Sequence, residues 1–377
     1  MIFFYFFYLT SKYIRIFASG MENLSFIADK LFEWYKIHHR ILPWRDIRDP
    51  YRIWISEIIL QQTRVIQGLD YYNRFIERFP DIHSLAAANE QEVLKYWQGL
   101  GYYSRARNLH ETARKIQTDF RGIFPEDYED ILSLKGIGEY TAAAIASIAF
   151  NAPYPVVDGN VFRFLSRLFA VDEPIDTAKG KKLFTELAGR MMDSSQPGLF
   201  NQAMMEFGAL QCIPASPDCS CCPFETQCFA HSVRKVNDFP VKRNKTKTKT
   251  LYLYYFHIRC GNSIYLKKRN KKGIWQNLYE FPRIESETPL EWEDLIGADD
   301  FKTLFPLIEH GHFRLVLKNQ KHVLTHRVLY ASFYEVIIEK TQESFAEYLS
   351  IPSDSMDEYP IHRLMQMYLE KYDDVIE

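Results

Sequence analysis

Two carboxylic acids are the side chains of this 377-residue chain best suited to chemistry. Glu57 lies in the apolar sequence Trp-Ile-Ser-Glu-Ile-Ile-Leu. If that side chain is buried, desolvation raises its pKa and keeps it protonated near neutral pH. Asp158 opens an Asp-Gly-Asn sequence at a predicted helix start, where N–H groups and the helix dipole favour the ionised form and lower the pKa. One protonated and one ionised carboxyl group can together break a glycosidic bond.

Both carboxyl groups also have a plainer interpretation. Glu57 could face solvent from its helix, and Asp158 could act only as a helix cap. The sequence alone leaves these alternatives open.

A group of cysteines forms a second candidate site, with the spacing C-x6-C-x2-C-x5-C: Cys212, Cys219, Cys222 and Cys228. A disulfide framework is disfavoured, because the chain has only 6 cysteines. Four thiolates on one compact loop favour a cubane iron–sulfur cluster. Structural zinc and free thiols are the alternatives, although zinc sites usually pair two C-x2-C sequences. Cys221 is a rival ligand to Cys222, and Cys260, in an apolar strand-like run, is expected to be a buried thiol.

Three other segments have the composition of nucleic-acid contacts. The Gly-x-Gly turn at Gly136 and Gly138 precedes a helix start whose N–H groups suit a phosphate, although such turns often only join helices. The polar residues 61–63 could fill a gap in a base stack or lie on the surface. Tyr102 and Tyr103 follow a flexible Gly-Leu-Gly turn and are either core residues or wedges that unstack a duplex.

The composition is that of a soluble globular protein long enough for two domains, with 47% hydrophobic and 25% charged residues. The net charge of −2 gives no overall signal for nucleic acid. Residues 252–377 nevertheless hold 15 basic and 20 acidic side chains, so that the remainder of the chain is slightly basic. A basic run at residues 234–249 is interpreted as a solvated linker, with phosphate contact as the alternative.

Hydrophobic periodicity divides the chain into a helical and a mixed part. Apolar residues recur at three- and four-residue spacing over residues 24–231, which predicts helices over residues 50–67 and 90–97, after Tyr103, and after Asp158. Asp49 as N-cap and Pro50 mark the start of the first of these. From residue 251 the period becomes two, which predicts strands at 251–258, 263–266 and 323–336, followed by a helix at 361–372.

The first 20 residues are unusual, because Met1 to Leu9 are nearly all aromatic or aliphatic. The segment is too short to span a bilayer and lacks the order of a signal peptide. We expect translation to start at Met21, with residues 1–20 as a start-site extension or a disordered segment.

Taken together, these residues resemble the adenine DNA glycosylase family (the MutY family), which belongs to the helix-hairpin-helix superfamily with endonuclease III. The resemblance covers residues 24–377 and rests on long contiguous segments around the carboxyl groups, glycines, tyrosines and cysteines. In this sequence they read Leu42-Pro-Trp-Arg, Pro50-Tyr-Arg-Ile-Trp-Ile-Ser-Glu-Ile-Ile-Leu-Gln-Gln-Thr, Gly99-Leu-Gly-Tyr-Tyr-Ser-Arg-Ala-Arg-Asn-Leu, Leu134-Lys-Gly-Ile-Gly-Glu-Tyr-Thr, Val157-Asp-Gly-Asn-Val and Phe200-Asn-Gln-Ala-Met-Met-Glu-Phe-Gly-Ala.

The resemblance implies a two-domain fold that combines an all-α part with an α+β part. Residues 21–231 would form a helix-hairpin-helix DNA glycosylase domain with a [4Fe-4S] loop at 212–228. Residues 232–250 would be a basic interdomain linker, and residues 251–377 a Nudix-like domain that recognises 8-oxoguanine. The Nudix box is absent after Gly273, so this domain is expected to bind nucleotides without hydrolysing them.

The resemblance also implies base excision by flipping of an adenine mispaired with 8-oxoguanine or guanine in double-stranded DNA. Glu57 matches the acid that protonates adenine at N7 and later activates water, and Asp158 matches the carboxylate that stabilises the sugar cation. Tyr140 and Asn160 match residues that position these groups. A related lyase has Lys where Tyr140 stands, so we expect a monofunctional enzyme.

The expected DNA and base contacts come from both domains: Arg45, Leu60, Gln61, Gln62, Thr63, Tyr102, Gly136, Gly138, Leu324, Thr325 and His326. The last three match a family Phe-Ser-His loop, in which Leu324 replaces the aromatic residue. We expect a monomer without membrane association, cytoplasmic and nucleoid-associated if bacterial. The alternatives are a related glycosylase of other base specificity and a non-catalytic iron–sulfur DNA-binding protein.

Overall fold

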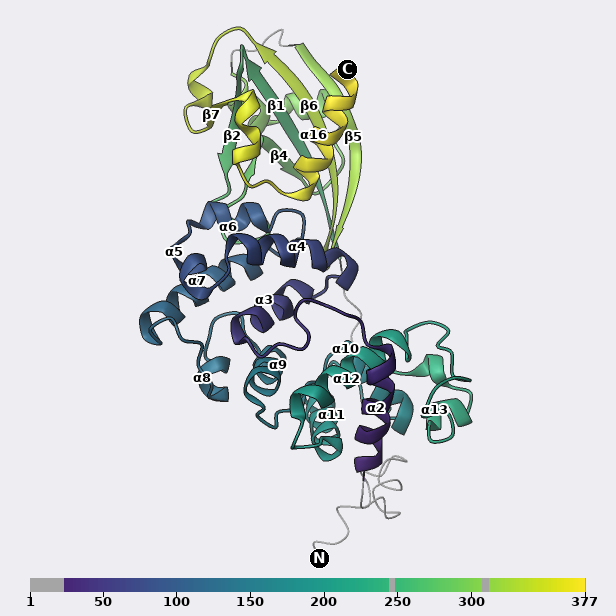
Figure 1. Ribbon diagram of the computed structural model, residues 1–377. Helices are drawn as coiled ribbons and strands as arrows, with labels where there is room; N and C mark the ends of the chain where they lie inside the picture. Colours follow the sequence, from purple (N-terminus) through teal and green to yellow (C-terminus); the bar gives the residue numbers. More distant parts are fainter. Residues whose placement is uncertain (1–23, 244–247, 307–311, 377) are drawn as a thin grey trace, which may run out of the picture. The chain divides into compact units, whose positions relative to one another are not determined.

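The computed structural model describes residues 24–243, 248–306 and 312–376, which pack into two compact units (Figure 1). The first unit comprises the described residues up to Tyr72 and from Lys115 to Arg243. The second comprises Asn73–Arg114 and the described residues from Thr248 onward. The expected extension at residues 1–20 and the expected start at Met21 lie outside the described residues, and the predicted domain limits stay a prediction.

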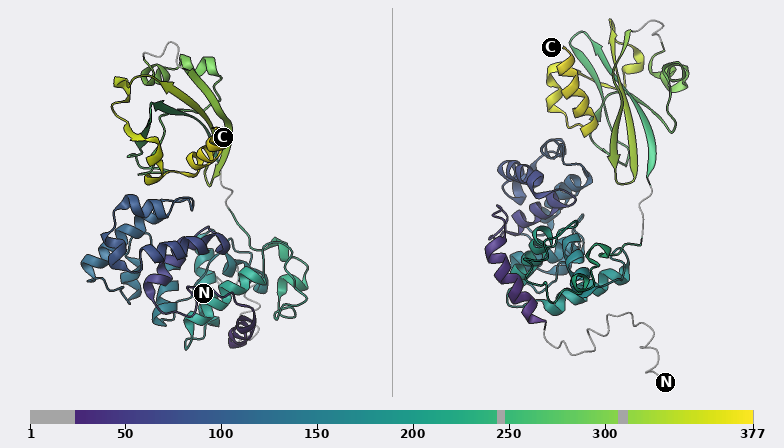
Figure 2. Two further views of the ribbon diagram at one scale, coloured as in Figure 1. Left: turned by 45° about the horizontal axis from the view of Figure 1, so that its top comes forward. Right: turned by 90° about the vertical axis from the view of Figure 1, so that its right-hand side faces the viewer.

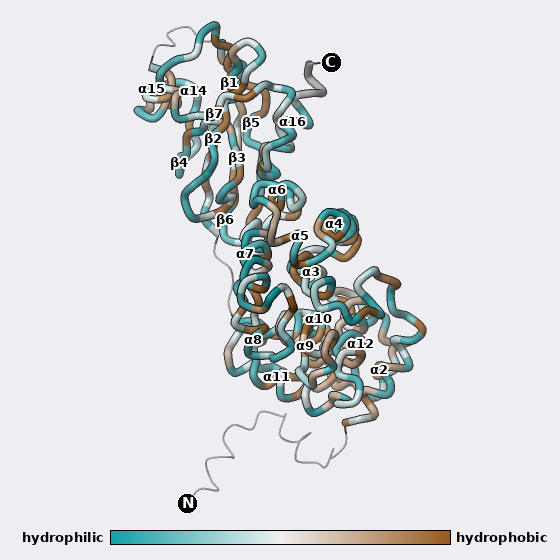
Figure 3. Tube along the Cα trace, turned by 60° about the vertical axis from the view of Figure 1, so that its left-hand side comes forward, coloured by the Kyte–Doolittle hydropathy of each residue, from teal (hydrophilic) through white to brown (hydrophobic). Residues whose placement is uncertain are grey.

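The described part of the first unit is helical. Two helices continue from one unit into the other, α4 (Val65–Arg78) and α7 (Ser104–Asp119). The others in this unit are α2 (Ser25–His38), α3 (Pro50–Leu60), α8 (Tyr128–Leu132), α9 (Glu139–Phe150), α10 (Gly159–Phe169), α11 (Ala178–Met191), α12 (Pro197–Leu210), α13 (Phe229–Ser232) and the 3-10 helix η1 (Val236–Asp238). In Figure 3 the tube of α4 shows both brown and teal turns, as expected of a helix with one apolar and one polar side.

Helix α3 begins as predicted but ends earlier. The Asp49 side chain accepts hydrogen bonds from the backbone N–H groups of Tyr51 and Arg52, and Pro50 occupies the first turn. The prediction of one helix through residue 67 is wrong, because the chain leaves helical geometry after Leu60 and Gln62 adopts a left-handed backbone with φ of 58°. A new helix, α4, then starts at Val65.

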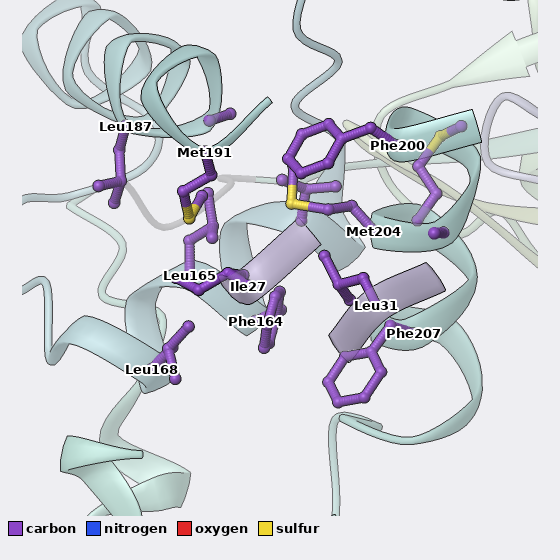
Figure 4. Close-up of a cluster of buried hydrophobic side chains, with 14 of the residues drawn as sticks. Ile27, Leu31, Phe164, Leu165, Leu168, Leu187, Met191, Phe200, Met204 and Phe207 are labelled. Carbon is purple, nitrogen blue, oxygen red and sulfur yellow. The ribbon is translucent and has the colours of Figure 1, made fainter. Parts of the chain in front are cut away.

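The core of the first unit lies between α2, α10, α11 and α12. Ile27 and Leu31 from α2 pack against side chains of the other three helices, and the close-up in Figure 4 shows Phe164, Leu165, Met204 and Phe207 among them. Leu31, Leu165 and Met204 have no exposed surface. This packing fixes α10, and therefore the Asp158 at its N-terminus, against α12.

The C-terminal part of the second unit is built on a seven-stranded sheet with the order β3-β2-β1-β6-β5, in which β4 pairs with β1 and β7 with β2. The central strands β1 and β6 are parallel, and β5 and β6 form an antiparallel hairpin. The strands are β1 (Lys249–Cys260), β2 (Ser263–Lys268), β3 (Tyr279–Glu280), β4 (Arg283–Ser286), β5 (His312–Leu324), β6 (Arg327–Ile338) and β7 (Leu349–Pro352).

Helices cover both faces of this sheet (Figure 2). Tyr368 of α16 contacts His257 and Phe333 on one face, whereas Phe301 of α15 contacts Phe256 on the other. Adjacent residues of β1 thus point to opposite faces, as strand geometry requires. The remaining helical elements of the unit are α5 (Ile82–Ala87), α6 (Glu90–Tyr96), α14 (Trp292–Gly297), α15 (Asp299–Leu304), η2 (Glu343–Phe345), η3 (Ser353–Glu358) and α16 (Arg363–Ile376).

The predicted fold class, helical followed by mixed α and β, is confirmed. One strand prediction is wrong. The single run expected at residues 323–336 is instead the end of β5, a turn at Thr325 and His326, and most of β6. The turn contains no Gly or Asn, the residues that usually indicate a tight hairpin. The sequence pattern therefore did not indicate where β5 ends and β6 begins. Cys260, expected to be buried, is half-buried at the end of β1.

Candidate active site

A cavity of about 670 Å³ lies in the first unit between α3, α9, α10 and α12. Its lining includes nine of the residues predicted to act on or contact the substrate: Arg45, Glu57, Leu60, Gln61, Gln62, Thr63, Tyr140, Asp158 and Asn160. These residues come from distant parts of the sequence, so folding alone brings them together.

Glu57 lies within the buried part of α3 and is only 8% exposed. The Tyr140 hydroxyl, from the first turn of α9, donates a hydrogen bond of 2.6 Å to its Oε2. Burial raises the pKa of Glu57, and the nearby Asp158 charge raises it further, although Tyr140 and Arg45 oppose the shift. Glu57 is therefore buried and does not face solvent, and its burial favours the protonated form.

Asp158 is the N-cap of α10. Its Oδ1 accepts hydrogen bonds from the backbone N–H groups of Asn160 at 2.9 Å and Val161 at 2.8 Å. The prediction that these groups lower the pKa of Asp158 below its ordinary value is wrong, because burial raises that pKa and outweighs the hydrogen bonds. A cap on an exposed helix would titrate low, whereas this one is half-buried in the wall of the cavity.

A chain of hydrogen bonds connects Asp158 with the cysteine-containing loop. The Asn160 amide donates to Asp158 Oδ2 at 2.7 Å, and Arg163 Nη2 donates to Asn160 Oδ1 at 2.9 Å. Arg163 Nε donates in turn to the carbonyl of Cys212 at 2.7 Å. Arg163 has the i+3 spacing from Asn160 that places both on one side of α10. The sequence analysis did not single out Arg163.

Glu206 is a second buried carboxylate that the sequence analysis missed. Arg40 donates to both of its oxygens, through Nε at 2.7 Å and Nη2 at 2.8 Å, and Arg45 Nη2 donates to Oε2 at 3.1 Å. Burial alone would raise the pKa of Glu206, but these two guanidinium groups hold it below its ordinary value. The signal was available, because Glu206 lies in the conspicuous segment that begins at Phe200.

The break after α3 places polar side chains on the cavity. Gln61, Gln62 and Thr63 occupy the turn between α3 and α4 and line the cavity wall. Gln61 Nε2 also contacts the Thr141 hydroxyl of α9 at 3.4 Å. In a continuous helix through residue 67, these three consecutive side chains would point in different directions, about 100° apart.

The remaining predicted contact residues lie elsewhere. Gly136 has a left-handed backbone with φ of 81°, and Gly138 is the N-cap of α9, so both shape the turn that follows α8. In the second unit, Tyr102 is 46% exposed, whereas Tyr103 is a buried core residue. The Tyr102 hydroxyl lies 2.5 Å from the Thr325 hydroxyl. Leu324, Thr325 and His326 form the end of the β5–β6 hairpin.

The four predicted cysteine ligands line one small cavity of the first unit, together with Phe164 and Arg167, whereas Cys221 does not line it. Burial raises the pKa of Cys222 to about 12. Arg167 Nη1 lies 3.5 Å from Cys212 Sγ, where its positive charge would stabilise a thiolate. Among the described residues, no three His, Cys, Asp or Glu side chains gather as around a single metal ion. A cubane cluster needs four thiolates arranged around one cavity, and these four cysteines line one cavity.

Within the described part of the chain, no helix is long and apolar enough to span a membrane. The basic run up to Arg243 is held to the first unit, since Val241 O accepts from Ile175 N and Arg243 N donates to Asp176.

Fold and site together define a class of protein. Residues 55–189 match the HhH-GPD superfamily of base excision DNA repair proteins, and residues 254–371 match the NUDIX domain. A solved thermostable thymine-DNA glycosylase is 27% identical with a TM-score of 0.51, over 56% of this chain and 97% of that one. The chain is accordingly a DNA N-glycosylase with a C-terminal Nudix-like domain.

The particular family follows from a relative that is matched over most of its length. The adenine DNA glycosylase of Buchnera aphidicola subsp. Baizongia pistaciae is 35% identical over 82% of this chain and 86% of its own length. The human adenine DNA glycosylase is 44% identical over 53% of this chain and 38% of its own length. The chain belongs to the adenine DNA glycosylase family, which confirms the resemblance noted from the sequence.

Proposed function

We propose that this protein removes adenine mispaired with 8-oxoguanine or guanine from double-stranded DNA, by hydrolysis of the N-glycosidic bond. The observation that carries the proposal is the pairing of two carboxyl groups in one cavity, the buried Glu57 and the half-buried Asp158. The cavity of about 670 Å³ is within the range of about 300–1,000 Å³ typical of ligand sites and is large enough for a flipped nucleotide.

Glu57 is the general acid. Burial raises the pKa of Glu57 and so favours its protonated form, and protonation of adenine at N7 turns the base into a better leaving group. As the bond between the sugar and N9 breaks, its electron pair leaves with the base and a positive charge develops on the sugar. Glu57 is then a carboxylate that can take a proton from the attacking water. The Tyr140 hydroxyl orients Glu57 throughout.

Asp158 stabilises the sugar cation. Although its pKa is raised in the DNA-free protein, a positive charge that develops nearby favours its ionised form. Asn160 and the N–H groups of α10 hold the carboxylate in place. Arg163 connects that arrangement to the cysteine loop.

The absence of an amine supports a monofunctional enzyme. None of the described residues that line the cavity is a lysine, and Tyr140 uses its hydroxyl to bond Glu57. A Schiff base with the sugar needs a neutral amine at this point. We therefore expect hydrolysis without efficient strand cleavage.

Recognition of 8-oxoguanine is assigned to the end of the β5–β6 hairpin. Thr325 retains a hydroxyl and His326 a hydrogen-bonding ring, and Tyr102 is an exposed aromatic ring beside them. Gln61, Gln62 and Thr63 would enter the base stack from the first unit, while Gly136 and Gly138 would approach the DNA phosphates.

Cys212, Cys219, Cys222 and Cys228 would hold a [4Fe-4S] cluster, the cofactor expected for this family. Bound there, the cluster would stabilise the loop at residues 212–228 structurally. In the proposed mechanism Glu57 and Asp158 carry the bond-breaking step.

The test is a single-turnover glycosylase assay on a panel of duplexes. Adenine release is expected from duplexes with adenine opposite 8-oxoguanine and guanine, and not from normal adenine–thymine pairs. A related glycosylase of other specificity is the second candidate, favoured only by the thymine-DNA glycosylase similarity, which leaves 44% of this chain uncovered. Release of thymine from guanine–thymine mispairs without adenine release would overturn the proposal.

A further inference from the structure

Residues 99–102, the Tyr102 turn, lie between α6 and α7 and carry the exposed Tyr102 ring on an unusual backbone. Gly99, Gly101 and Tyr102 all have left-handed backbones, with φ of 98°, 77° and 47°. Glycine adopts this conformation freely, whereas for a tyrosine it is strained and persists only where the surroundings hold it. The contacts that hold this turn therefore decide where the Tyr102 ring lies.

Local contacts fix the shape of the turn. Trp97 Nε1 donates a hydrogen bond to the Gly101 carbonyl at 3.1 Å, and Arg105 Nη2 donates to the same carbonyl at 3.3 Å. The Tyr103 hydroxyl accepts from Gly99 N–H at 3.2 Å. All of these partners are close in sequence, so they do not determine where the turn lies relative to the C-terminal sheet.

Two side chains that flank the turn bind the C-terminal part of the same unit. Gln98 Oε1 accepts from Ile361 N–H at 3.0 Å, and the Tyr103 hydroxyl donates to the Ile361 carbonyl at 3.2 Å. Tyr103 and Ile361 are both buried, so water competes little for these bonds. Both backbone polar groups of one residue are thus bound, one from each side of the Tyr102 turn.

Ile361 is itself attached to the sheet. It forms a parallel bridge with Tyr279 of β3, whose N–H donates to the Pro360 carbonyl at 2.9 Å. The next residue, His362, has no exposed surface, and its ring stacks on Trp275 with a centroid distance of 3.8 Å. This segment is therefore a fixed part of the sheet, and a turn bound to it is fixed as well.

The Tyr102 turn meets the same unit a second time at the end of the β5–β6 hairpin, where the hydroxyls of Tyr102 and Thr325 are in contact. This contact is exposed, so water can replace it at little cost. The less accessible bonds of Gln98 and Tyr103 to Ile361 are therefore the ones that keep the ring beside the hairpin.

We propose that Gln98 and Tyr103 are positioning residues for the choice of lesion. They fix the Tyr102 turn to the sheet, so that its exposed ring and the Thr325 hydroxyl form one preformed surface for the strand that carries 8-oxoguanine. A preformed surface loses less conformational entropy on binding than one that must first be ordered. The inference rests on the proposed function, which supplies the substrate. Neither residue lines the carboxyl-containing cavity of the first unit, so both act on the choice of duplex and not on bond breaking.

The first measurement is hydrogen–deuterium exchange in the full, DNA-free chain, which reports on the turn independently of any substrate. Tyr103→Phe removes the hydroxyl and keeps the buried ring. Gln98→Leu removes the acceptor for Ile361 N–H and leaves the Tyr103 hydroxyl in place. Each variant should speed exchange in peptides that span residues 99–102 about two- to tenfold, the effect of one lost hydrogen bond.

Two further variants are the controls. Gln98→Glu keeps an acceptor oxygen and should leave exchange in the turn unchanged. Gln91→Leu also removes hydrogen bonds between α6 and the C-terminal part, those with the Glu358 carbonyl and the Tyr279 hydroxyl, but it does not flank the turn. It too should leave exchange in residues 99–102 unchanged.

The second measurement is the ratio of kcat/KM values for adenine release from duplexes with 8-oxoguanine and with guanine opposite adenine. Tyr103→Phe and Gln98→Leu should lower this ratio about two- to tenfold, whereas Gln98→Glu and Gln91→Leu should retain it. A purely structural defect would lower both kcat/KM values together and leave their ratio unchanged.

Unchanged exchange in Tyr103→Phe and Gln98→Leu would overturn the positioning role, and faster exchange with an unchanged ratio would overturn its link to lesion choice. Either variant is sufficient if the other does not fold. Failure of the proposed function is distinguishable, because the unaltered protein would then show no preference for the 8-oxoguanine duplex. That result would also overturn the link to lesion choice, and the exchange measurement would still decide whether the two residues hold the turn.

Discussion

Glu57 is the residue whose chemistry depends most on its surroundings. An exposed glutamate on a helix would be ionised at neutral pH. Here the apolar side chains of α3 remove it from water, and the Tyr140 hydroxyl occupies one oxygen. In the proposed mechanism the second oxygen carries the proton that passes to the base.

Replacement of Glu57 by Gln should lower the single-turnover rate of adenine release by at least about 10²–10⁴-fold, the usual contribution of general acid–base catalysis. The isosteric amide cannot give up a proton to the leaving base. Affinity for the lesion duplex, measured by gel shift, should be retained. Glu186→Gln, on the exposed side of α11, is the matched control and should leave the rate unchanged. Adenine release by Glu57→Gln at the normal rate would show that Glu57 is not the general acid.

The pH dependence of adenine release follows from the two raised pKa values. Glu57 is active when protonated, so activity should be lost as pH rises through its raised pKa. Asp158 is active when ionised, so activity should be lost as pH falls through its own raised pKa. Single-turnover rates across pH should give a bell displaced to higher pH than two ordinary carboxyl groups would give. A rate that does not change with pH would contradict both assignments.

At the scale of elements, α12 allows the N-terminus of α10 to come close enough to place Asp158 and Asn160 on the cavity. A Cβ added at Gly208 of α12 would lie 2.6 Å from the Asn160 carbonyl oxygen and 2.7 Å from Asn160 Cβ. Neither is the movable end of a long side chain. The N-terminus of α10, with Asp158 and Asn160, can reach its position only because residue 208 has no side chain.

Gly208→Ala should therefore displace the N-terminus of α10 and slow adenine release at least tenfold, because small misplacements of reacting groups are costly. Gly198→Ala is a matched control on the same helix, where the added Cβ would lie 2.7 Å from the Ser147 carbonyl oxygen, remote from the two carboxyl groups. Both variants should lose thermal stability, measured by circular dichroism. Equal adenine-release rates in the two folded variants would contradict a role for close α10–α12 packing in catalysis.

The cysteine loop offers a comparison between adjacent residues. Cys222 lines the small cavity and Cys221 does not. Cys222→Ser should abolish the visible absorbance of an iron–sulfur cluster and lower the melting temperature, whereas Cys221→Ser should preserve both. Iron content and absorbance of the purified variants measure this. Loss of the cluster in Cys221→Ser, with retention in Cys222→Ser, would reverse the ligand assignment.

At the scale of the whole molecule, the second unit combines helices from the middle of the chain with the C-terminal sheet. Arg107 of α7 donates to the Gln276 carbonyl at 2.9 Å, and Tyr103 donates to the Ile361 carbonyl at 3.2 Å. The Tyr102–Thr325 contact lies in the same unit. The exposed aromatic ring and the hairpin end therefore belong to one packed body.

Thr325 tests this arrangement through discrimination between 8-oxoguanine and guanine opposite adenine. Thr325→Val keeps the shape but removes the hydroxyl, and one lost hydrogen bond of about 0.5–1.5 kcal/mol should reduce the preference about two- to tenfold. Thr325→Ser should retain it. The measurement is the ratio of kcat/KM values on the two duplexes. An unchanged ratio in Thr325→Val would exclude the hydroxyl from lesion recognition.

Local signals in the sequence determined much of this protein. The N-caps Asp49 and Asp158, the helix at residues 90–97 and the change to a period of two at residue 251 all depend on neighbouring residues, and the structure contains each of them. Motifs of consecutive residues also identified the family and the nine residues that line the carboxyl-containing cavity.

Only the tertiary structure decided how these parts act on one another. The break of α3 at Leu60 was not predicted from the sequence. The ion pairs of Glu206 with Arg40 and Arg45 join groups distant in sequence, and the raised pKa of Asp158 depends on burial by other elements. Burial is a property of the packed chain, so a sequence pattern that correctly predicts a helix cap cannot tell whether water reaches it. The sequence thus named the two carboxyl groups, and packing set their proton affinities.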